Sequence, residues 1–532
     1  MPKMWIGGQW NGSASRRAFA VSNPATESVL DEVPRADARD ADRAVRAAAE
    51  AFRTWRTTPG LERANLMHQF ATALRQKHHA IARQMTLEGG KPLIENIDEI
   101  EWCAGVFDYY GEIARDQAGK VLAPVSRHQV NFVRKEPYGV VVCIVPWNYP
   151  LLLMSWKVAP ALAAGNTVVI KPSEETPLST LMLAEDFARF GPGVVNIVTG
   201  YGVEVGEPLV VHRDTALVAF TGSIATGKAI AAAAAPHLKK LNLELGGNDP
   251  FIVCDDVDIE VAAKGAAWAA FLNMGQVCTS GERFYVFESV FERFVDRFAA
   301  IARGLRLGDP MGPDIDCGPL IRESHRVQIE KKIADAVAQG AKVVCGGRRP
   351  PDMKKGFFFE PTVLVNVNHT MSLMRSETFG PIAPIMPVKG IEEAVRLADD
   401  SEYGLGANIY TNNLQYAMYA MENIHAGTFW INDPLTDNDA GPFGGMRMSG
   451  MGRELGIEGL DAFREPKHVH MDWKIEAKPY WYPYRWENVT GAGHGGPGAA
   501  PAASRPRPAS RAPAAGKSSV ARKARRKGGR KR

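Results

Sequence analysis

Short apolar runs recur at regular intervals from residue 140 onward, and helix-like stretches lie between several of them. The runs cover residues 140–145, 167–170, 194–198, 216–220 and 240–244, and the helix-like stretches cover residues 151–164, 178–189 and 226–239. Strands that alternate with helices at this spacing predict a parallel sheet built from βαβ units. Residues 40–117 are rich in Ala, Leu, Glu and Arg, which predicts long amphipathic helices before the sheet begins.

Polar motifs directly follow four of the predicted strands. They are Pro-Trp-Asn at residues 146–148, Lys-Pro-Ser-Glu at 171–174, Thr-Gly-Ser at 221–223, and Glu244. Parallel sheets of this kind place ligands at the carboxyl ends of their strands. The four motifs therefore predict an active site at that edge of the sheet.

Glu244 and Cys278 are the most informative pair in the chain. They lie 34 residues apart, in Leu-Glu-Leu-Gly-Gly-Asn-Asp-Pro and in Gly-Gln-Val-Cys. Glu-Thr-Phe-Gly-Pro follows at residues 377–381, and Pro-Phe-Gly-Gly leads to Gly-Arg-Glu-Leu-Gly at residues 442–456. In order and spacing these motifs resemble the NAD(P)-dependent aldehyde dehydrogenase family, and the resemblance runs from about Trp5 to about Trp473.

The resemblance implies an α/β fold with three folded parts and a tail. Its Rossmann-like, parallel-sheet NAD-binding domain is expected at residues 1–118 and 138–246, and its second, catalytic α/β domain at residues 247–446. A small β element for oligomerisation is expected at residues 119–137 and 460–475. The Gly/Pro/Ala/Ser-rich and then basic residues 491–532 cannot bury a core, so we predict a disordered tail.

The resemblance also implies the roles of the catalytic residues. Cys278 is the expected nucleophile, because a thiolate attacks an aldehyde carbon well. The side-chain amide of Asn148 and the backbone N–H of Cys278 are expected to stabilise the oxyanion. Glu244 is the expected base that activates water to hydrolyse the thioester. Glu454 fits either a proton-relay role or a solvated glutamate at a helix start.

NAD is the cofactor that the resemblance implies. Glu174, past a strand end, would accept hydrogen bonds from the adenosine ribose and would repel the 2′-phosphate of NADP. Residues 222–228 fit the start of a P-loop, but Ala229 stands where Ser or Thr is needed, which excludes an ATPase. The same loop and helix can hold a pyrophosphate instead. The expected cofactor-binding residues are Val145, Pro146, Trp147, Lys171, Ser173, Glu174, Gly222, Ser223, Gly227, Leu245, Glu377 and Phe379.

The substrate is indicated by three aromatic residues. Trp156 follows Tyr149 by seven residues on a predicted helix, where such positions share a face, and Phe443 lies in the late motif. In the betaine and amino-aldehyde branches of the family, aromatic residues at these positions enclose a cationic substrate. The alternative is a hydrophobic funnel for neutral aldehydes. Asp433-Pro434 lies in a loop that, by the resemblance, helps to form the wall of the substrate tunnel.

Charge is distributed unevenly along the 532 residues. Residues 491–532 hold 12 of the 63 Lys and Arg and no acid, so residues 1–490 carry 51 bases and 59 acids. A basic tail of this kind suggests contact with nucleic acid or another polyanion through residues 505–532, and a solvated tail without function is the alternative. A CoA-acylating dehydrogenase is a third alternative, but it would need no base such as Glu244.

Composition sets the remaining expectations. No apolar run reaches the roughly 18 residues that a membrane span needs, so no membrane contact is expected. The six cysteines, at positions 103, 143, 254, 278, 317 and 345, have neither disulfide-framework nor metal-ligand spacing. We therefore expect no metal and a reducing, cytoplasmic compartment. The expected partners are a small-molecule aldehyde and further copies of the chain, in a homodimer or homotetramer.

Overall fold

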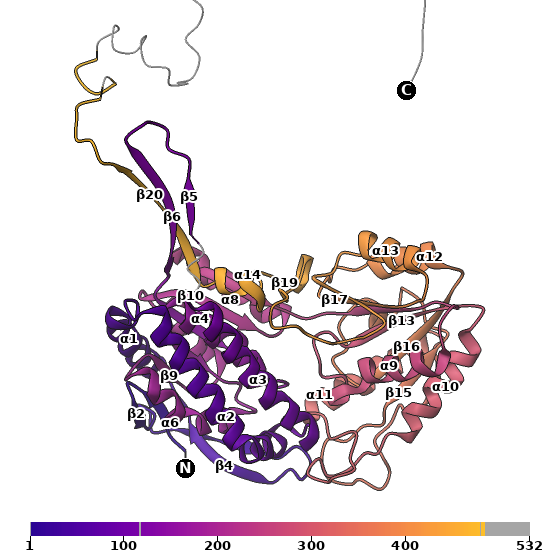
Figure 1. Cartoon of the computed structure of the whole chain (residues 1–532). Helices are drawn as coiled ribbons and strands as arrows, with labels where there is room; N and C mark the ends of the chain where they lie inside the picture. Colours follow the sequence, from indigo (N-terminus) through magenta and orange to yellow (C-terminus); the bar gives the residue numbers. More distant parts are fainter. Residues whose placement is uncertain (1, 116–118, 479, 485–532) are drawn as a thin grey trace, which may run out of the picture. The chain divides into compact units, whose positions relative to one another are not determined.

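A computed structural model describes residues 2–115, 119–478 and 480–484 (Figure 1). The chain divides into two compact units. One comprises residues 1–125 and 130–471, and the other comprises residues 126–129 and 472–532. The predicted disordered and polyanion-binding tail, residues 491–532, lies outside the described residues. No helix in the described ranges is both long and apolar enough to cross a membrane.

Three long helices precede the first sheet, as the sequence predicts for residues 40–117. They are α1 (Ala38–Trp55), α2 (Gly60–Gly89) and α3 (Leu93–Ile113). Helix α1 begins with a capping box in which the side chains of Asp37 and Asp40 accept backbone N–H groups reciprocally. Helices α2 and α3 pack side by side (Figure 1), and their apolar faces contribute Phe70, Phe107 and Tyr110 to a buried core.

The first sheet has eight strands in the order β19-β11-β10-β7-β8-β9-β1-β2. Five of them coincide closely with the predicted apolar runs and are mutually parallel: β7 (Val140–Ile144), β8 (Thr167–Lys171), β9 (Val195–Ile197), β10 (Thr215–Thr221) and β11 (Lys240–Glu244). The order reverses between β10 and β7, which is where open α/β sheets bind ligands. The parallel, Rossmann-like α/β class that the sequence predicts is confirmed.

Three short antiparallel strands at the edges of this sheet lie outside the predicted runs. At the N-terminus, β1 (Met4–Ile6) pairs with β9 and with β2 (Gln9–Asn11). At the other edge, β19 (Gly450–Met451) pairs with β11, so that Gly450 lies opposite Glu244. This pairing brings the late part of the chain to the strand that carries the predicted base.

The connecting helices differ in detail from the predicted stretches. Helix α4 (Leu152–Ala164) matches residues 151–164 closely. Residues 178–189 instead form α5 (Pro177–Met182), α6 (Ala184–Phe187) and a 3-10 turn. Helix α8 (Ile224–Ala234) ends five residues before the predicted end at residue 239. Pro236 explains that early end, because it has no N–H for an α-helical hydrogen bond, and the chain continues as a 3-10 turn over Ala235–His237.

The second sheet contains seven strands in the order β14-β15-β16-β13-β12-β17-β18. All neighbours are parallel except β14 and β15. Its strands are β12 (Asp249–Val253), β13 (Gly281–Phe287), β14 (Lys342–Cys345), β15 (Thr362–Val365), β16 (Ile382–Val388), β17 (Gly406–Tyr410) and β18 (Thr428–Ile431). The helices in this segment of the chain are α9 (Ile259–Phe271), α10 (Phe291–Gly304), α11 (Glu323–Ala338), α12 (Ile391–Asp399) and α13 (Leu414–Asn423). This α/β layer occupies the segment in which the sequence predicts the catalytic domain.

A third, small sheet joins β20 (Arg464–Asp472), β6 (Gln129–Pro137) and β5 (Lys120–Leu122) (Figure 1). It lies where the sequence predicts the oligomerisation element. All three residues of β5 are exposed. In the small second unit, the backbone N–H of Trp473 donates to the carbonyl of His128.

Candidate functional site

Cys278 follows helix α9 on a loop with an unusual backbone. Asn273, Met274 and Gly275 have φ angles of 46°, 59° and 69°, so three consecutive residues are left-handed. This conformation costs free energy at residues other than glycine, and such strain clusters at functional sites. The loop is also fixed by close packing, because a Cβ on Gly247 would lie 2.3 Å from the Cys278 carbonyl oxygen. The thiol is therefore presented from a rigid turn.

Asn148 is tied to the same loop. Its side-chain Nδ2 donates to the carbonyl of Gln276 at 2.9 Å. Its own carbonyl accepts from Asn273 Nδ2 at 3.3 Å and from Lys91 Nζ at 3.4 Å. The residue is buried, and the bond to Gln276 uses one of the two hydrogens of its side-chain amide. Asn148 and Cys278 thus belong to one hydrogen-bonded structure, as an oxyanion site would require.

Glu244 ends strand β11 and is buried. Among the residues that the structure describes, neither carboxylate oxygen meets a hydrogen-bond partner at normal geometry. The charges of Lys157 and Arg453 and the Gly445 N–H stabilise the carboxylate from nearby. Burial, followed by the charge of Glu454, raises the pKa of Glu244 well above its ordinary value. A buried carboxylate without a partner needs a functional explanation, and a proton acceptor for water is one.

A buried ion pair lies beside this carboxylate. Lys157 Nζ, on helix α4, is 2.6 Å from Glu454 Oε1 and 2.5 Å from Thr221 Oγ1. Both charged side chains are fully buried, so the expectation of a solvated Glu454 at a helix start is wrong. The proton-relay role of Glu454 stays a prediction. Lys157 escaped the sequence analysis, although a single Lys in the apolar run of residues 151–164 was a visible signal.

Two cavities meet at Cys278. The first, of about 210 Å³, is lined by residues from the carboxyl ends of β7, β10 and β11 and from the second sheet. Besides Cys278, eight of the expected cofactor-binding and catalytic residues line it: Pro146, Trp147, Asn148, Gly222, Ser223, Leu245, Glu377 and Phe379. The structure therefore brings the strand-end motifs and the Glu-Thr-Phe-Gly-Pro motif to one cavity beside the thiol.

Glu377 and Phe379 form the wall of this cavity that comes from the second sheet. Glu377 Oε1 accepts from the Gly247 N–H at 3.1 Å. Burial, with a smaller contribution from the charge of Glu282, raises the pKa of Glu377 to about 8. Phe379 packs edge-on against Trp147, with ring centroids 5.5 Å apart. A flat ring and a buried acceptor side by side suit the nicotinamide riboside half of a dinucleotide.

The loop before α8 is shaped to receive a pyrophosphate. Ser223 caps the helix, and its side chain accepts from the Thr226 N–H. The backbone N–H groups of a first helical turn attract anions. A Cβ on Gly227 would lie 2.5 Å from the side chain of Leu245, so this helix packs closely against the strand that follows it.

The remaining cofactor-binding candidates lie at the end of β8. Lys171 Nζ donates to the Pro172 carbonyl at 3.0 Å and lies 3.4 Å from Glu174 Oε2. The Val145 N–H donates to the Lys171 carbonyl, which joins this strand end to that of β7. Ser173 is buried, whereas the Glu174 carboxylate is 36% exposed. An exposed acid at this strand end is free to meet ribose hydroxyls, so these residues fit the adenosine half of a dinucleotide.

The second cavity, of about 140 Å³, lies on the other side of Cys278 and has largely apolar walls. The three residues expected to contact substrate all line it. Trp156 and Phe443 are buried and lie 4.8 Å apart between ring centroids. Tyr149 lies on the turn before α4 and not on the helix, so the helical spacing predicted for it is wrong. Pro150 explains the difference, because the residue before a proline avoids helical backbone.

Several residues of this cavity escaped the sequence analysis. Trp102 on α3 and Trp268 on α9 contribute further rings, and about half of each side chain is exposed. Leu435, Thr436 and Asp437 contribute a loop that the sequence analysis identified only at Asp433-Pro434. No local motif indicates these residues, because which face of a helix meets a cavity depends on the tertiary packing.

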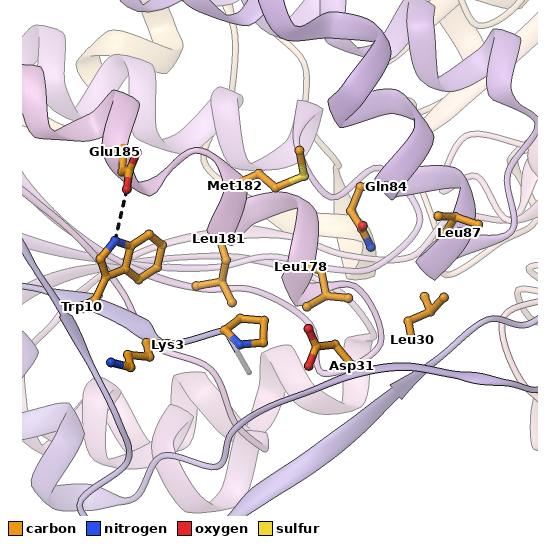
Figure 2. A pocket seen from close by; sticks show the side chains of 11 residues that line it. Lys3, Trp10, Leu30, Asp31, Gln84, Leu87, Leu178, Leu181, Met182 and Glu185 are labelled. Atoms are coloured by element: carbon orange, nitrogen blue, oxygen red, sulfur yellow. Dashed lines mark hydrogen bonds between the residues drawn. The ribbon is translucent and has the colours of Figure 1, made fainter.

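A cavity larger than either of these two lies elsewhere. It measures about 680 Å³ and is lined by residues from the N-terminal strands, α2 and α5 (Figure 2). Trp10 Nε1 donates to Glu185 Oε1 at its edge, at 3.4 Å (Figure 2). None of the predicted site residues lines it. Size alone therefore does not locate the chemistry, and the thiol and the buried carboxylates do.

Comparison with known proteins gives consistent results. The family model of the aldehyde dehydrogenase family matches residues 10–469. Betaine aldehyde dehydrogenase 1 of Oryza sativa subsp. japonica is 42% identical over 490 residues, which cover 90% of this chain and 97% of that protein. Aminoaldehyde dehydrogenase 2 of Zea mays is 40% identical over 477 residues, 88% of this chain and 94% of that protein. The crystal structure of betaine aldehyde dehydrogenase from Staphylococcus aureus in complex with NAD+ superimposes with a TM-score of 0.88, at 36% identity, over 90% of this chain and 96% of that one.

Proposed function

Because the chain belongs to the aldehyde dehydrogenase family, we propose that it oxidises a cationic aldehyde, such as betaine aldehyde, to the carboxylic acid with NAD. One observation carries the proposal. Cys278 lies where the two cavities meet: the first, lined by the strand-end motifs and Glu377, is called the polar cavity, and the second, lined by Tyr149, Trp156 and Phe443, is called the aromatic cavity. The buried carboxylate of Glu244 has a raised pKa through burial and the nearby charge of Glu454. A nucleophile, a proton acceptor and separate spaces for two reactants are what this reaction needs.

The reaction begins when Cys278 Sγ adds to the aldehyde carbon. Burial, and then the charges of Asp249 and Glu244, raise the pKa of the Cys278 thiol, so the proton must leave as the sulfur attacks. The proton passes to solvent, so Glu244 stays deprotonated for the hydrolysis step. The carbonyl oxygen becomes an oxyanion, which the Asn148 side-chain amide and the Cys278 backbone N–H stabilise. The loop geometry that holds these donors supports this role, because it fixes them before the charge develops.

When NAD is bound, it supplies the acceptor for the hydride that leaves the tetrahedral carbon. The residues of the polar cavity would hold it there. Phe379, with Trp147 packed edge-on against it, would lie beside the nicotinamide ring, and Glu377 would accept hydrogen bonds from the adjacent ribose. Lys171 and Glu174 would share the adenosine ribose. The exposed carboxylate of Glu174 supports NAD over NADP, because it would repel a 2′-phosphate.

Hydrolysis then releases the product. A water molecule gives its proton to Glu244 and adds to the thioester carbon, the C–S bond breaks, and Cys278 regains its thiol. Because burial raises its pKa, Glu244 is a stronger base than an exposed glutamate. A buried base without a hydrogen-bond partner supports transfer of the acyl group to water and gives no support to transfer to CoA.

The aromatic cavity supports a cationic substrate. Each ring face that a quaternary ammonium contacts contributes roughly 0.5–2 kcal/mol. Tyr149, Trp156 and Phe443 provide three such rings near the thiol. Two relatives, a betaine aldehyde dehydrogenase at 42% identity and an aminoaldehyde dehydrogenase at 40% identity, support the same substrate class.

We further propose that the protein is a homodimer or homotetramer of the cytoplasm. Val121 and Leu122 on the edge strand β5 are exposed and apolar, which supports an interface at the third sheet. The six cysteines are free, which fits a reducing compartment. Contact with nucleic acid or another polyanion through residues 505–532 is a proposal that rests on charge alone.

The experiment compares NADH formation from betaine aldehyde and from its neutral isostere, 3,3-dimethylbutanal, at equal concentrations. We expect kcat/KM to favour the cation by more than about tenfold, equivalent to about 1.4 kcal/mol. Cys278→Ala serves as the control and is expected to be inactive with both. The matched control is Cys345→Ala, a half-buried thiol that lines neither cavity at the site.

Two results would contradict parts of the proposal. Equal rates for the two aldehydes would mean that the rings of the aromatic cavity only provide a hydrophobic funnel. The protein would then be a general aldehyde dehydrogenase. NADH formation in Cys278→Ala at the rate of the unmodified protein would remove Cys278 from the mechanism.

A further inference from the structure

The aromatic cavity contains one acid and no base. Of the side chains that line it, Asp437 alone carries a charge, and the others are aromatic, aliphatic, hydroxyl or thiol groups. Acids are seldom placed in an apolar cavity without a partner, because burial disfavours the charged form. The position of Asp437 therefore needs an explanation.

The Asp437 carboxylate has no internal partner. Within the part of the chain that the structure describes, it accepts no hydrogen bond and forms no ion pair. Burial, followed by the charge of Asp439, raises the pKa of Asp437 to about 7. The ionisable groups whose charges couple to it are Asp439 on the same loop, Tyr149 on the turn before α4, and Cys278. None of these groups carries a positive charge. A cation from outside the chain would therefore be the first counter-charge of the Asp437 carboxylate.

The loop that carries Asp437 is held in place. Trp430 Nε1 donates to the Thr436 carbonyl at 2.7 Å, directly before the acid. Directly after it, Asn438 Oδ1 accepts from the Ala440 N–H at 2.9 Å. Leu435 has a left-handed backbone, with φ 61°, and its buried side chain anchors the loop to the core of the second sheet. The carboxylate is thus placed at the cavity by packing.

We infer that Asp437 determines charge specificity by accepting a hydrogen bond from a protonated primary amine at the far end of the aldehyde. The inference rests on the proposed function and goes beyond it, because a primary ammonium and a quaternary one differ. A quaternary nitrogen has no N–H and contacts only ring faces. A primary ammonium donates hydrogen bonds to a carboxylate, and such charge-assisted bonds are about twice as strong as neutral ones. The carboxylate without a partner therefore favours amino-aldehydes.

The test compares 3-aminopropanal with butanal, which has the same number of heavy atoms and no charge. In Asp437→Asn we expect kcat/KM for 3-aminopropanal to fall at least about tenfold, because a charge-assisted pair at the cavity is lost. Butanal is expected to change by less than about threefold, and betaine aldehyde is expected to lose less than 3-aminopropanal.

The matched control is Asp433→Asn. Asp433 lies on the same loop and carries the same charge, but it is exposed and does not line the cavity. It is expected to leave the ratio of the two aldehydes unchanged. Asp437→Ala provides a second variant should the asparagine variant unfold. An equal loss for 3-aminopropanal and butanal in both Asp437 variants would overturn the inference and leave the dehydrogenase intact.

A second readout is independent of turnover. Propylammonium is expected to slow the alkylation of Cys278 by iodoacetamide in the unmodified protein and to protect at least about tenfold less well in Asp437→Asn. Equal protection in both proteins would overturn the inference. If the unmodified protein oxidised none of the three aldehydes, the proposed function would fail, and the protection experiment would still decide whether Asp437 binds a cation.

Discussion

The two cavities that meet at Cys278 are built in different ways. The polar cavity is formed by strand ends, a helix N-terminus and closely packed glycines, with backbone groups in fixed positions. The aromatic cavity is formed by side chains from three helices and by the loop that contains Asp437. The first arrangement suits chemistry that every substrate shares, and the second suits a choice among substrates. Changes in the two cavities should therefore separate into effects on rate and effects on selectivity.

The largest effect is expected where the cavities meet. Cys278→Ala removes the atom that forms the covalent bond, so NADH formation should fall at least about a thousandfold with every aldehyde. The thermal unfolding midpoint should stay close to that of the unmodified protein, as should that of Cys345→Ala. A Cys278→Ala variant that lost activity with one class of aldehyde only would break the proposed division between rate and selectivity.

Glu244→Gln should give the next largest effect, about a hundredfold in kcat. The thioester should still form once, so rapid mixing should show a burst of NADH close to one per active site followed by slow turnover. The sign of the pH dependence follows from the raised pKa of Glu244. The acting form is the deprotonated one, so kcat should rise as pH rises, and Glu244→Gln should lose that rise. A variant without a burst would place Glu244 before the thioester and not after it.

The polar cavity can be tested for selectivity among cofactors. Glu174→Ala removes the carboxylate that would face a 2′-phosphate, so the ratio of kcat/KM for NADP to that for NAD should rise about tenfold. The ratio between two aldehydes should not change. Glu175→Ala, the neighbouring acid that pairs with Arg322, serves as the matched control and should leave the cofactor ratio unchanged.

The parts of the site that the sequence predicts are those set by local structure. The strand-end motifs, Glu244 among them, follow from short-range patterns, since a strand, its following turn and the next helix are continuous in the chain. Cys278 and the catalytic role of Glu244 follow from the resemblance of their motifs to the family. Lys157 and Asp437 depend on how distant segments pack, and no pattern around either residue indicates its neighbours. The pairing of β19 with β11 is a further example, because two residues near the end of the chain complete the edge beside Glu244.

Tyr149 and Trp156 line the same cavity, as the sequence predicts, but the structural reason differs from the predicted one. The sequence groups Tyr149 with Trp156 through helical spacing, yet Tyr149 lies on a turn before α4. The same cavity receives both side chains because Glu99 holds that turn, accepting the N–H groups of Leu151 and Leu152 at 3.0 Å. A buried acid on helix α3, 52 residues before Leu151 in the sequence, therefore fixes the geometry.

The aromatic cavity should make selectivity depend on pH. Betaine aldehyde keeps its charge at every pH, and dividing its kcat/KM by that of 3,3-dimethylbutanal cancels the titration of shared catalytic groups. Burial raises the pKa of Asp437 to about 7, so its charge is present above that pH and is lost below it. The ratio should fall from pH 8 to pH 6.5, by at most about fourfold, because the rings keep part of the preference when the carboxylate is protonated. Asp437→Asn should give a ratio that does not change with pH, and a slope that survived in this variant would assign the titration to another group.

The smallest effect should come from the outer rings. Trp268 is half exposed at the cavity, so a cation there keeps part of its hydration and gains about 0.5–1 kcal/mol from the ring. Trp268→Ala should therefore lower kcat/KM for betaine aldehyde about threefold, and kcat at saturation should stay nearly constant. Trp10→Ala, a partly exposed ring at the separate cavity of Figure 2, is the matched control and should change neither quantity. A loss in kcat as large as that in kcat/KM would mean that Trp268 also positions the reacting carbon, and the division between the two cavities would then fail at this ring.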